Sequence, residues 1–152
     1  MFTYAATLEV NPSDVPIALT RAQLWRGLEM KAENPLEFVP GMESCEIVER
    51  YADGFLREVV LRGDRLRERI RFTPHIQVHF QRVGIPGWIV NMVSESDRGL
   101  LLTFAFAVEF VNVASGSDTE RARGASLCAN YRKAVDTTLA TTRRLVSQKA
   151  IV

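Results

Sequence analysis

The chain has 152 residues, with 19 basic and 18 acidic side chains, a formal charge of +1 and 47% hydrophobic residues. This composition is typical of one globular domain with a full hydrophobic core, and it excludes an intrinsically disordered chain. A charge so close to neutral gives no net attraction to nucleic acid or to an acidic membrane surface, so we expect no nucleic-acid partner.

We expect neither an export signal nor a membrane-spanning segment. Residues 2–10 lack the basic start and the long apolar core of a signal peptide. The most apolar run, residues 100–114, is too short to span a bilayer and contains Glu109. The two cysteines, Cys45 and Cys128, are expected to be buried free thiols rather than a disulfide. We therefore expect a cytoplasmic protein.

Apolar and polar side chains alternate over residues 2–10, which predicts a strand. A helix should begin after Thr20, because Gln23 three residues later completes a capping box. The apolar side of this helix holds Leu24, Trp25, Leu28 and Ala32. The helix should end before Pro35, since the residue before a proline avoids helical geometry. A second short helical segment is expected over residues 35–39.

Residues 42–111 are expected to form a series of strands joined by short turns. Each turn contains glycine or proline: Ala52-Asp53-Gly54, Gly63-Asp64, Thr73-Pro74-His75, residues 83–87 and residues 96–99. After a polar break, helical spacing predicts one long helix over residues 119–148.

This order of elements predicts an α+β fold. It is a curved seven-stranded antiparallel sheet wrapped around a long C-terminal helix, with two short helices after the first strand. A sheet of this length must twist, and one helix should not fill its whole concave face. A cavity is therefore expected between the helix and the sheet.

Turn geometry sets the register of the strands, and the register decides which side chains share a face. We take Gly63-Asp64 as a two-residue loop and Ala52-Asp53-Gly54 as a three-residue loop. One face is then apolar and should face the helix; it holds Cys45, Ile47, Tyr51, Phe55, Val59, Leu61, Leu66, Ile70, Phe72, Ile76, Val78 and Phe80, joined by Leu102, Phe104, Phe106, Val108 and Phe110. In the strand over residues 88–95, either Trp88, Val90 and Met92 or Ile89, Asn91 and Val93 point inward.

Three charged residues fall on this inner face. The predicted register places Arg57 opposite Glu49 and diagonal to Glu68, within side-chain reach. Buried charges are almost always paired, and two carboxylates around one guanidinium leave an excess of negative charge. Arg132, water, a proton or a ligand could balance it. A structural ion-pair network, a ligand anchor and an acid catalyst all fit this cluster.

The outer face of the sheet offers weaker candidates. His75 and His79 share it without neighbouring cysteines or carboxylates, so no metal site is expected. The arginines at positions 65, 67, 69 and 71 form a stripe, which is either a solvated surface or a surface that binds an anion or a protein. No nucleophile elbow, phosphate loop, dinucleotide fingerprint or zinc spacing occurs, so we expect no cofactor.

Several short motifs occur in an order that resembles one superfamily. They are Leu19-Thr20-Arg21-Ala22-Gln23-Leu24-Trp25-Arg26-Gly27-Leu28, Asn34-Pro35, Phe38-Val39-Pro40-Gly41, Arg57-Glu58-Val59, Arg67-Glu68-Arg69-Ile70 and Leu102-Thr103-Phe104. The order resembles the START-like (SRPBCC) superfamily, with the helix-grip fold of the major birch pollen allergen, and more narrowly its AtaL-like branch. The resemblance implies one START-like ligand-binding domain over residues 1–152, with an internal pocket for lipids, sterols, polyketides or similar molecules.

We therefore expect the chain to bind a small hydrophobic ligand in an internal cavity, of a size typical for ligand sites, roughly 300–1,000 Å³. The residues expected to form this site are Glu49, Arg57, Val59, Glu68, Ile70, Phe80, Phe104, Phe106, Cys128, Tyr131 and Val135. Two alternatives stay open. The same cavity could house a cofactor-free cyclase or aromatase, as in other members of the superfamily, or the outer arginines could make the chain a protein-interaction module.

Overall fold

The computed structural model describes residues 1–152. Its elements follow the predicted order: β1 (Phe2–Glu9), α1 (Arg21–Glu33), the 3-10 helix η1 (Pro35–Glu37), β2 (Met42–Tyr51), β3 (Gly54–Leu61), β4 (Asp64–Thr73), β5 (Gln77–Arg82), β6 (Gly87–Ser94), β7 (Leu101–Val108) and α2 (Asp118–Ser147). The strands form one antiparallel sheet in the order β1-β7-β6-β5-β4-β3-β2. The predicted α+β fold is thus confirmed.

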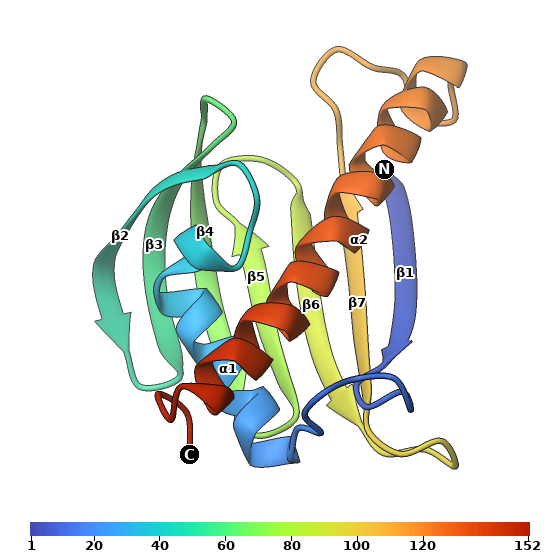
Figure 1. The fold of residues 1–152 in the computed structure, drawn as a ribbon. Helices are drawn as coiled ribbons and strands as arrows, with labels where there is room; N and C mark the ends of the chain where they lie inside the picture. The colour runs from blue at the N-terminus through green and yellow to red at the C-terminus, as the bar shows by residue number, and fades with distance from the viewer.

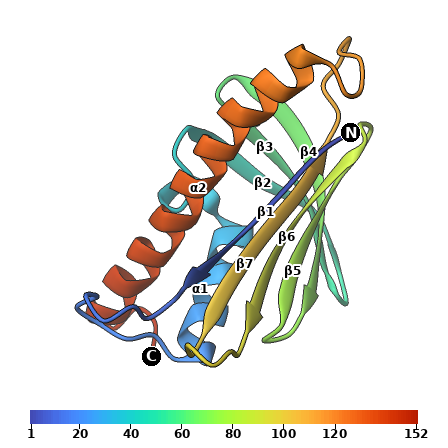
Figure 2. The same ribbon diagram turned by 90° about the vertical axis from the view of Figure 1, so that its right-hand side faces the viewer.

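Both helices lie on the same side of the sheet (Figure 1). The long helix α2 runs diagonally across this side, and the sheet curves around it (Figure 2). The shorter α1 lies beside the C-terminal half of α2, where Gly27 allows the two helices to approach closely: a Cβ on Gly27 would lie 2.3 Å from Thr142 Oγ1. None of the helices is long and apolar enough to cross a membrane.

Local signals fix both ends of α1 as predicted. The backbone N–H of Gln23 donates to Thr20 Oγ1, and the backbone N–H of Thr20 donates to Gln23 Oε1, which completes the capping box. The helix ends at Glu33, before Asn34 and Pro35. Its buried side includes the four predicted residues, Leu24, Trp25, Leu28 and Ala32.

The predicted inner face of β7 is confirmed, because Leu102, Phe104, Phe106 and Val108 are all buried. Phe110 lies beyond the end of β7 and is half-buried. The choice left open for β6 is settled by its pairing with β7. Asn91 lies opposite Phe104 and Val93 opposite Leu102, so Ile89, Asn91 and Val93 point inward.

The hairpin between β3 and β4 differs from its predicted register by two residues. Its two-residue loop is Arg62-Gly63, and both residues have positive φ, 49° and 85°, as a type I′ turn requires. Arg57 consequently lies directly opposite Glu68. A shift of two residues leaves every side chain on its predicted face.

The register of β2 departs further from the prediction. Its loop to β3 is the two residues 52–53, and β2 has a bulge at Val48, between the pairs Ile47–Arg57 and Glu49–Leu56. The bulge puts Glu49 on the opposite face from Ile47, where it is exposed and accepts a hydrogen bond from Tyr51 Oη. The predicted inward positions of Glu49 and Tyr51 are therefore wrong.

Ile76 is a third inward prediction that is wrong. It belongs to the loop between β4 and β5 and is 49% exposed, because Thr73 pairs with Gln77 and the loop is residues 74–76. Val78 and Phe80, two and four residues later, are buried as predicted.

Candidate functional site

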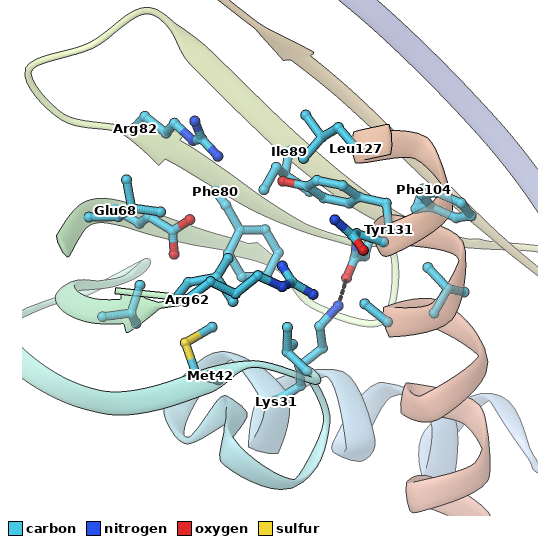
Figure 3. Close-up of a pocket in the computed structure, with 18 of the residues that line it drawn as sticks. Lys31, Met42, Arg62, Glu68, Phe80, Arg82, Ile89, Phe104, Leu127 and Tyr131 are labelled. Carbon is cyan, nitrogen blue, oxygen red and sulfur yellow. Dashed lines mark hydrogen bonds between the residues drawn. The ribbon is translucent and has the colours of Figure 1, made fainter. Parts of the chain in front are cut away.

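A cavity of about 100 Å³ lies between α2, α1 and the sheet (Figure 3). Seven of the residues expected at the site line it: Arg57, Val59, Glu68, Phe80, Phe104, Tyr131 and Val135. Ile70 and Phe106 are buried in the core beside it, and Cys128 is half-buried on α2. Glu49 lies outside, for the reason given above.

The cavity is smaller than the expected size of a ligand site. Large side chains occupy much of the concave space: the rings of Phe80, Phe104 and Tyr131 and the long side chains of Lys31 and Arg82 all line it. The sequence predicts that the three rings lie at the cavity, but it predicts neither the positions of Lys31 and Arg82 nor how much space the side chains leave.

One end of the cavity approaches the surface. Leu127 and Asn130 of α2 line the cavity and also a hollow on the protein surface, which the half-buried Phe110 and the exposed Arg123 border as well. Leu127 and Asn130, which border both spaces, form the mouth of the cavity.

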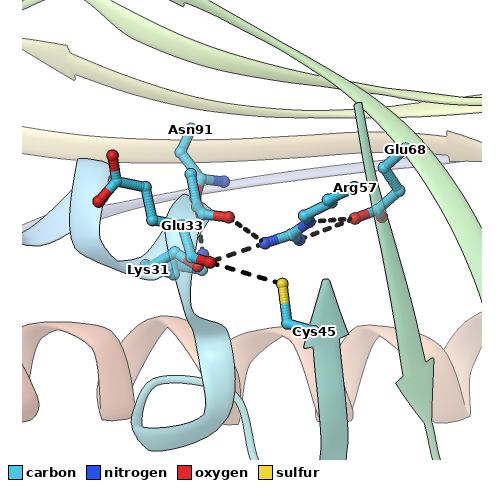
Figure 4. Close-up of polar contacts among 7 residues, drawn as sticks. Lys31, Glu33, Cys45, Arg57, Glu68 and Asn91 are labelled. Atoms are coloured by element: carbon cyan, nitrogen blue, oxygen red, sulfur yellow. Dashed lines mark hydrogen bonds and ion pairs between the residues drawn. The ribbon is translucent and has the colours of Figure 1, made fainter. Parts of the chain in front are cut away.

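The predicted pairing of Arg57 with Glu68 is present and buried. Arg57 Nε and Nη2 both donate to Glu68 Oε2, at 2.9 and 2.7 Å, and each residue is only 4% exposed. Arg57 Nη1 donates to the carbonyl oxygens of Lys31 and Ala32, at 3.3 and 2.6 Å (Figure 4). These carbonyls belong to the last turn of α1, which has no helical partners for them. Arg57 therefore joins β3, β4 and the end of α1.

Lys31 is a polar cavity residue that the sequence analysis missed. Its Nζ donates to Asn91 Oδ1 at 2.7 Å and lies 5.9 Å from the centre of the Phe80 ring. Burial, together with the nearby Arg57 guanidinium, lowers the pKa of Lys31 to about 8, and Glu68 opposes the shift. A signal for Lys31 was present, because it follows Leu24 by seven positions and so shares the inner side of α1.

Tyr131 and Arg82 complete the polar wall. The Tyr131 ring stacks on Phe106 with ring centres 4.3 Å apart, and burial raises the pKa of Tyr131 to about 12, while the Arg82 guanidinium opposes the shift. Arg82 Nε is buried and has no hydrogen-bond partner. Arg82 was not among the predicted site residues, although it continues the alternation of Val78 and Phe80 and the pattern of β5 therefore carried a signal for its inward position.

The charge of the site is opposite in sign to the prediction. Four basic residues line the cavity, Lys31, Arg57, Arg62 and Arg82, against the single carboxylate of Glu68. The predicted second carboxylate, Glu49, lies outside, and Arg132, the proposed partner, is exposed. Apolar walls with surplus cationic donors are suited to hold the oxygen atoms of an otherwise apolar molecule.

The outer arginines are balanced within the sheet. Arg65 and Arg67 form ion pairs with Glu58, and Arg69 and Arg71 form ion pairs with Asp53. The stripe therefore presents less free charge than its sequence indicates.

The chain matches one family along nearly its whole length. The model of the AtaL family, described as acetylaranotin biosynthesis cluster protein L, matches residues 4–149. No curated protein matches the sequence.

Solved structures with the same fold include three informative cases. The di-domain ARO/CYC StfQ from the steffimycin biosynthetic pathway has a TM-score of 0.70 and 13% identity, over 95% of this chain and 52% of its own, so the chain spans about half of StfQ. A START superfamily protein from Mycobacterium smegmatis has a TM-score of 0.65 and 13% identity, and the match covers 91% of this chain and 97% of that protein. Ara h 8.0201 has a TM-score of 0.60 and 12% identity, and the match covers 94% of this chain and 98% of that protein. The START-like fold expected from the sequence motifs is confirmed.

Proposed function

The chain belongs to the AtaL family, and from that premise we propose that its cavity binds a small, mainly apolar metabolite that carries oxygen atoms, of the polyketide type. The observation that supports this proposal is the cavity itself, in which apolar walls surround four basic side chains and one carboxylate. The family description refers to a biosynthesis cluster, and StfQ is described as an ARO/CYC protein of a biosynthetic pathway. Both descriptions are consistent with such a ligand.

The size of the cavity limits how such a ligand can be held. A space of about 100 Å³ accommodates part of a multi-ring molecule at most. We propose that the oxygen-bearing end of the ligand enters the cavity and that the remainder passes Leu127 and Asn130 to the surface hollow. Catalysis on a ligand held in this way is a second candidate function, favoured by the environment of Lys31.

Binding of two matched probes, benzyl alcohol and benzoate, tests the proposal. Both are monocyclic, and only benzoate is charged. We expect NMR shifts of cavity-lining residues on titration, and Ala134→Phe, which fills the cavity from α2, should weaken both probes by at least about tenfold, or about 1.4 kcal/mol. Ala140→Phe places the same side chain on an exposed position of α2 and should bind like the unchanged protein. Equal binding by both variants, or no binding at all, would contradict a ligand site in the cavity.

The charge surplus has its own test in the same titration. Replacing Arg82 by Met removes a guanidinium whose Nε has no protein partner, so it should weaken benzoate by about tenfold and benzyl alcohol much less. If Arg82→Met weakens the two probes equally, the basic side chains do not select oxygen anions.

A further inference from the structure

Lys31 differs from the other lysines of the chain. There are three lysines, and Lys133 and Lys149 are exposed, whereas Lys31 is half-buried and lines the cavity. It lies in the last turn of α1, and its amine enters the cavity next to Phe80 of β5 and Asn91 of β6. A surface position is the usual one for lysine, because burial of an ammonium group is costly.

The amine of Lys31 lacks the partner that a buried lysine normally has. The only carboxylate in the cavity wall, Glu68, is held by two hydrogen bonds from Arg57. No carboxylate lies within ion-pairing distance of Lys31 Nζ, whose hydrogen bond goes to the neutral amide of Asn91. The Phe80 ring lies next to both cations, 5.9 Å from Lys31 Nζ and 5.2 Å from the Arg57 guanidinium carbon.

This environment shifts the protonation equilibrium of Lys31 toward the uncharged amine. Apolar surroundings remove solvation from the charged form, and a neighbouring cation repels it; a lysine so placed is an activated nucleophile. The fall in the pKa of Lys31 to about 8 agrees with both effects. The hydrogen bond to Asn91 Oδ1 uses an N–H of the amine and leaves the nitrogen lone pair free.

We propose that Lys31 is a nucleophilic amine that condenses with a carbonyl group of the ligand, and that the ligand class is a 1,3-dicarbonyl compound. The proposal rests on the proposed function, because it assigns a chemical class to the molecule in the same cavity. The Nζ lone pair attacks the carbonyl carbon as the C=O π bond breaks, and the addition product loses one water to form C=N. A proton from the carbon between the two carbonyls then moves to give the conjugated enaminone. The net change is amine plus diketone to enaminone plus water, and no oxidant is needed.

A 1,3-dicarbonyl is the class that suits the rest of the wall. Its second oxygen gains negative character in the enaminone and needs a hydrogen-bond donor. Arg82, on β5, lines the same cavity, and its buried Nε has no partner within the protein. Lys31 and Arg82 thus supply a nucleophile for one carbonyl and a donor for the other.

Incubation with pentane-2,4-dione, followed by mass spectrometry, tests the proposal. Under denaturing conditions we expect the protein to gain one molecule of the dione less one water, with the modified peptide carrying Lys31. Labelling at Lys31 should exceed that at Lys133 and Lys149 by at least about tenfold near pH 7.5, because far more of its amine is uncharged. Peptide mapping reads the N-terminal amine separately. Lys133→Met should label normally and Lys31→Met should not. Lys31→Arg, which keeps a donor for Asn91 but lacks the nucleophile, gives the same answer if Lys31→Met does not fold.

Native mass spectrometry of the same samples separates the two proposals. A complex whose mass includes the whole dione, and which dissociates on denaturation, would overturn the role of Lys31 while leaving ligand binding intact. The absence of any complex would contradict both. Equal labelling of the three lysines would also overturn the proposal, because it would show that Lys31 has no special reactivity.

Discussion

Arg57 connects the β3–β4 hairpin to the end of α1, and its partners decide what its loss would do. It donates to Glu68 on β4 and to two carbonyls at the end of α1. The alternation of side chains between the two faces of a strand was enough to predict that Arg57 and Glu68 meet on the inner face of the sheet. The same rule failed for Glu49, because a bulge adds one residue to β2 and no feature of the sequence marks it. Lys31 was missed because only the apolar residues of α1 were assigned to its inner side.

Replacing Arg57 with Leu should lower the free energy of unfolding by about 3–5 kcal/mol, because Glu68 is left as an unpaired buried charge. Denaturant unfolding measures this. Arg67→Leu removes a half-exposed partner of Glu58 on the outer face and should cost less than about 1 kcal/mol. A further Glu68→Leu change should restore only part of the loss, since the carbonyls of α1 stay without donors. If Arg57→Leu lowers the free energy of unfolding no more than Arg67→Leu does, the assignment of a buried ion pair between Arg57 and Glu68 is wrong.

The pKa of Lys31 makes stability depend on pH in one direction. In the folded protein this pKa is about 8, against its ordinary value of 10.5, so between these pH values the unfolded chain binds more protons. The free energy of unfolding should therefore rise with pH across this window, by about 1–3 kcal/mol, and gain nothing from Lys31 below it. The unfolding free energy of Lys31→Met should lack this rise, whereas Lys133→Met should keep it. If the unfolding free energies of the two variants change with pH in the same way, the claim that the amine of Lys31 is enclosed would be contradicted.

The elements were predictable to different degrees, for physical reasons. Helix α1 has a capping box at its start and Asn34-Pro35 at its end, and both signals act over a few residues. The side chains of β3 and β4 were assigned to the correct faces despite a wrong choice of turn, because the resulting error in register was an even number of residues. The closeness of α1 and α2, by contrast, depends on a contact between Gly27 and Thr142, which no local pattern reveals.

Gly27→Ala tests this helix contact. At an exposed helical position this change would stabilise, because glycine weakens helices by roughly 0.5–1 kcal/mol. Here the added methyl would lie 2.3 Å from Thr142 Oγ1, so we expect destabilisation by about 1–3 kcal/mol in thermal or denaturant unfolding.

The double variant with Thr142→Ala supplies the control for this contact. Thr142→Ala removes the atoms that clash, so the two changes together should cost at least about 1 kcal/mol less than the sum of the single changes. Additive costs would mean that the two helices do not touch at this point.

At the scale of the whole molecule, the existence of a cavity was predictable and its volume was not. A curved sheet with one long helix across it leaves concave space, and this follows from the order of elements alone. The volume depends on how the large side chains that line the cavity pack, which is decided by their conformations. The sign of the site's charge depended in turn on one bulge and on two basic residues, Lys31 and Arg82, that continue apolar patterns.

The most direct test of a ligand site between α2 and the sheet is a crystal structure of the protein with pentane-2,4-dione. We expect density for the dione inside the cavity, continuous with Lys31 Nζ and within hydrogen-bonding distance of Arg82. Density confined to the outer face of the sheet, with the cavity unchanged, would contradict the central claim that this cavity is where the protein binds its ligand.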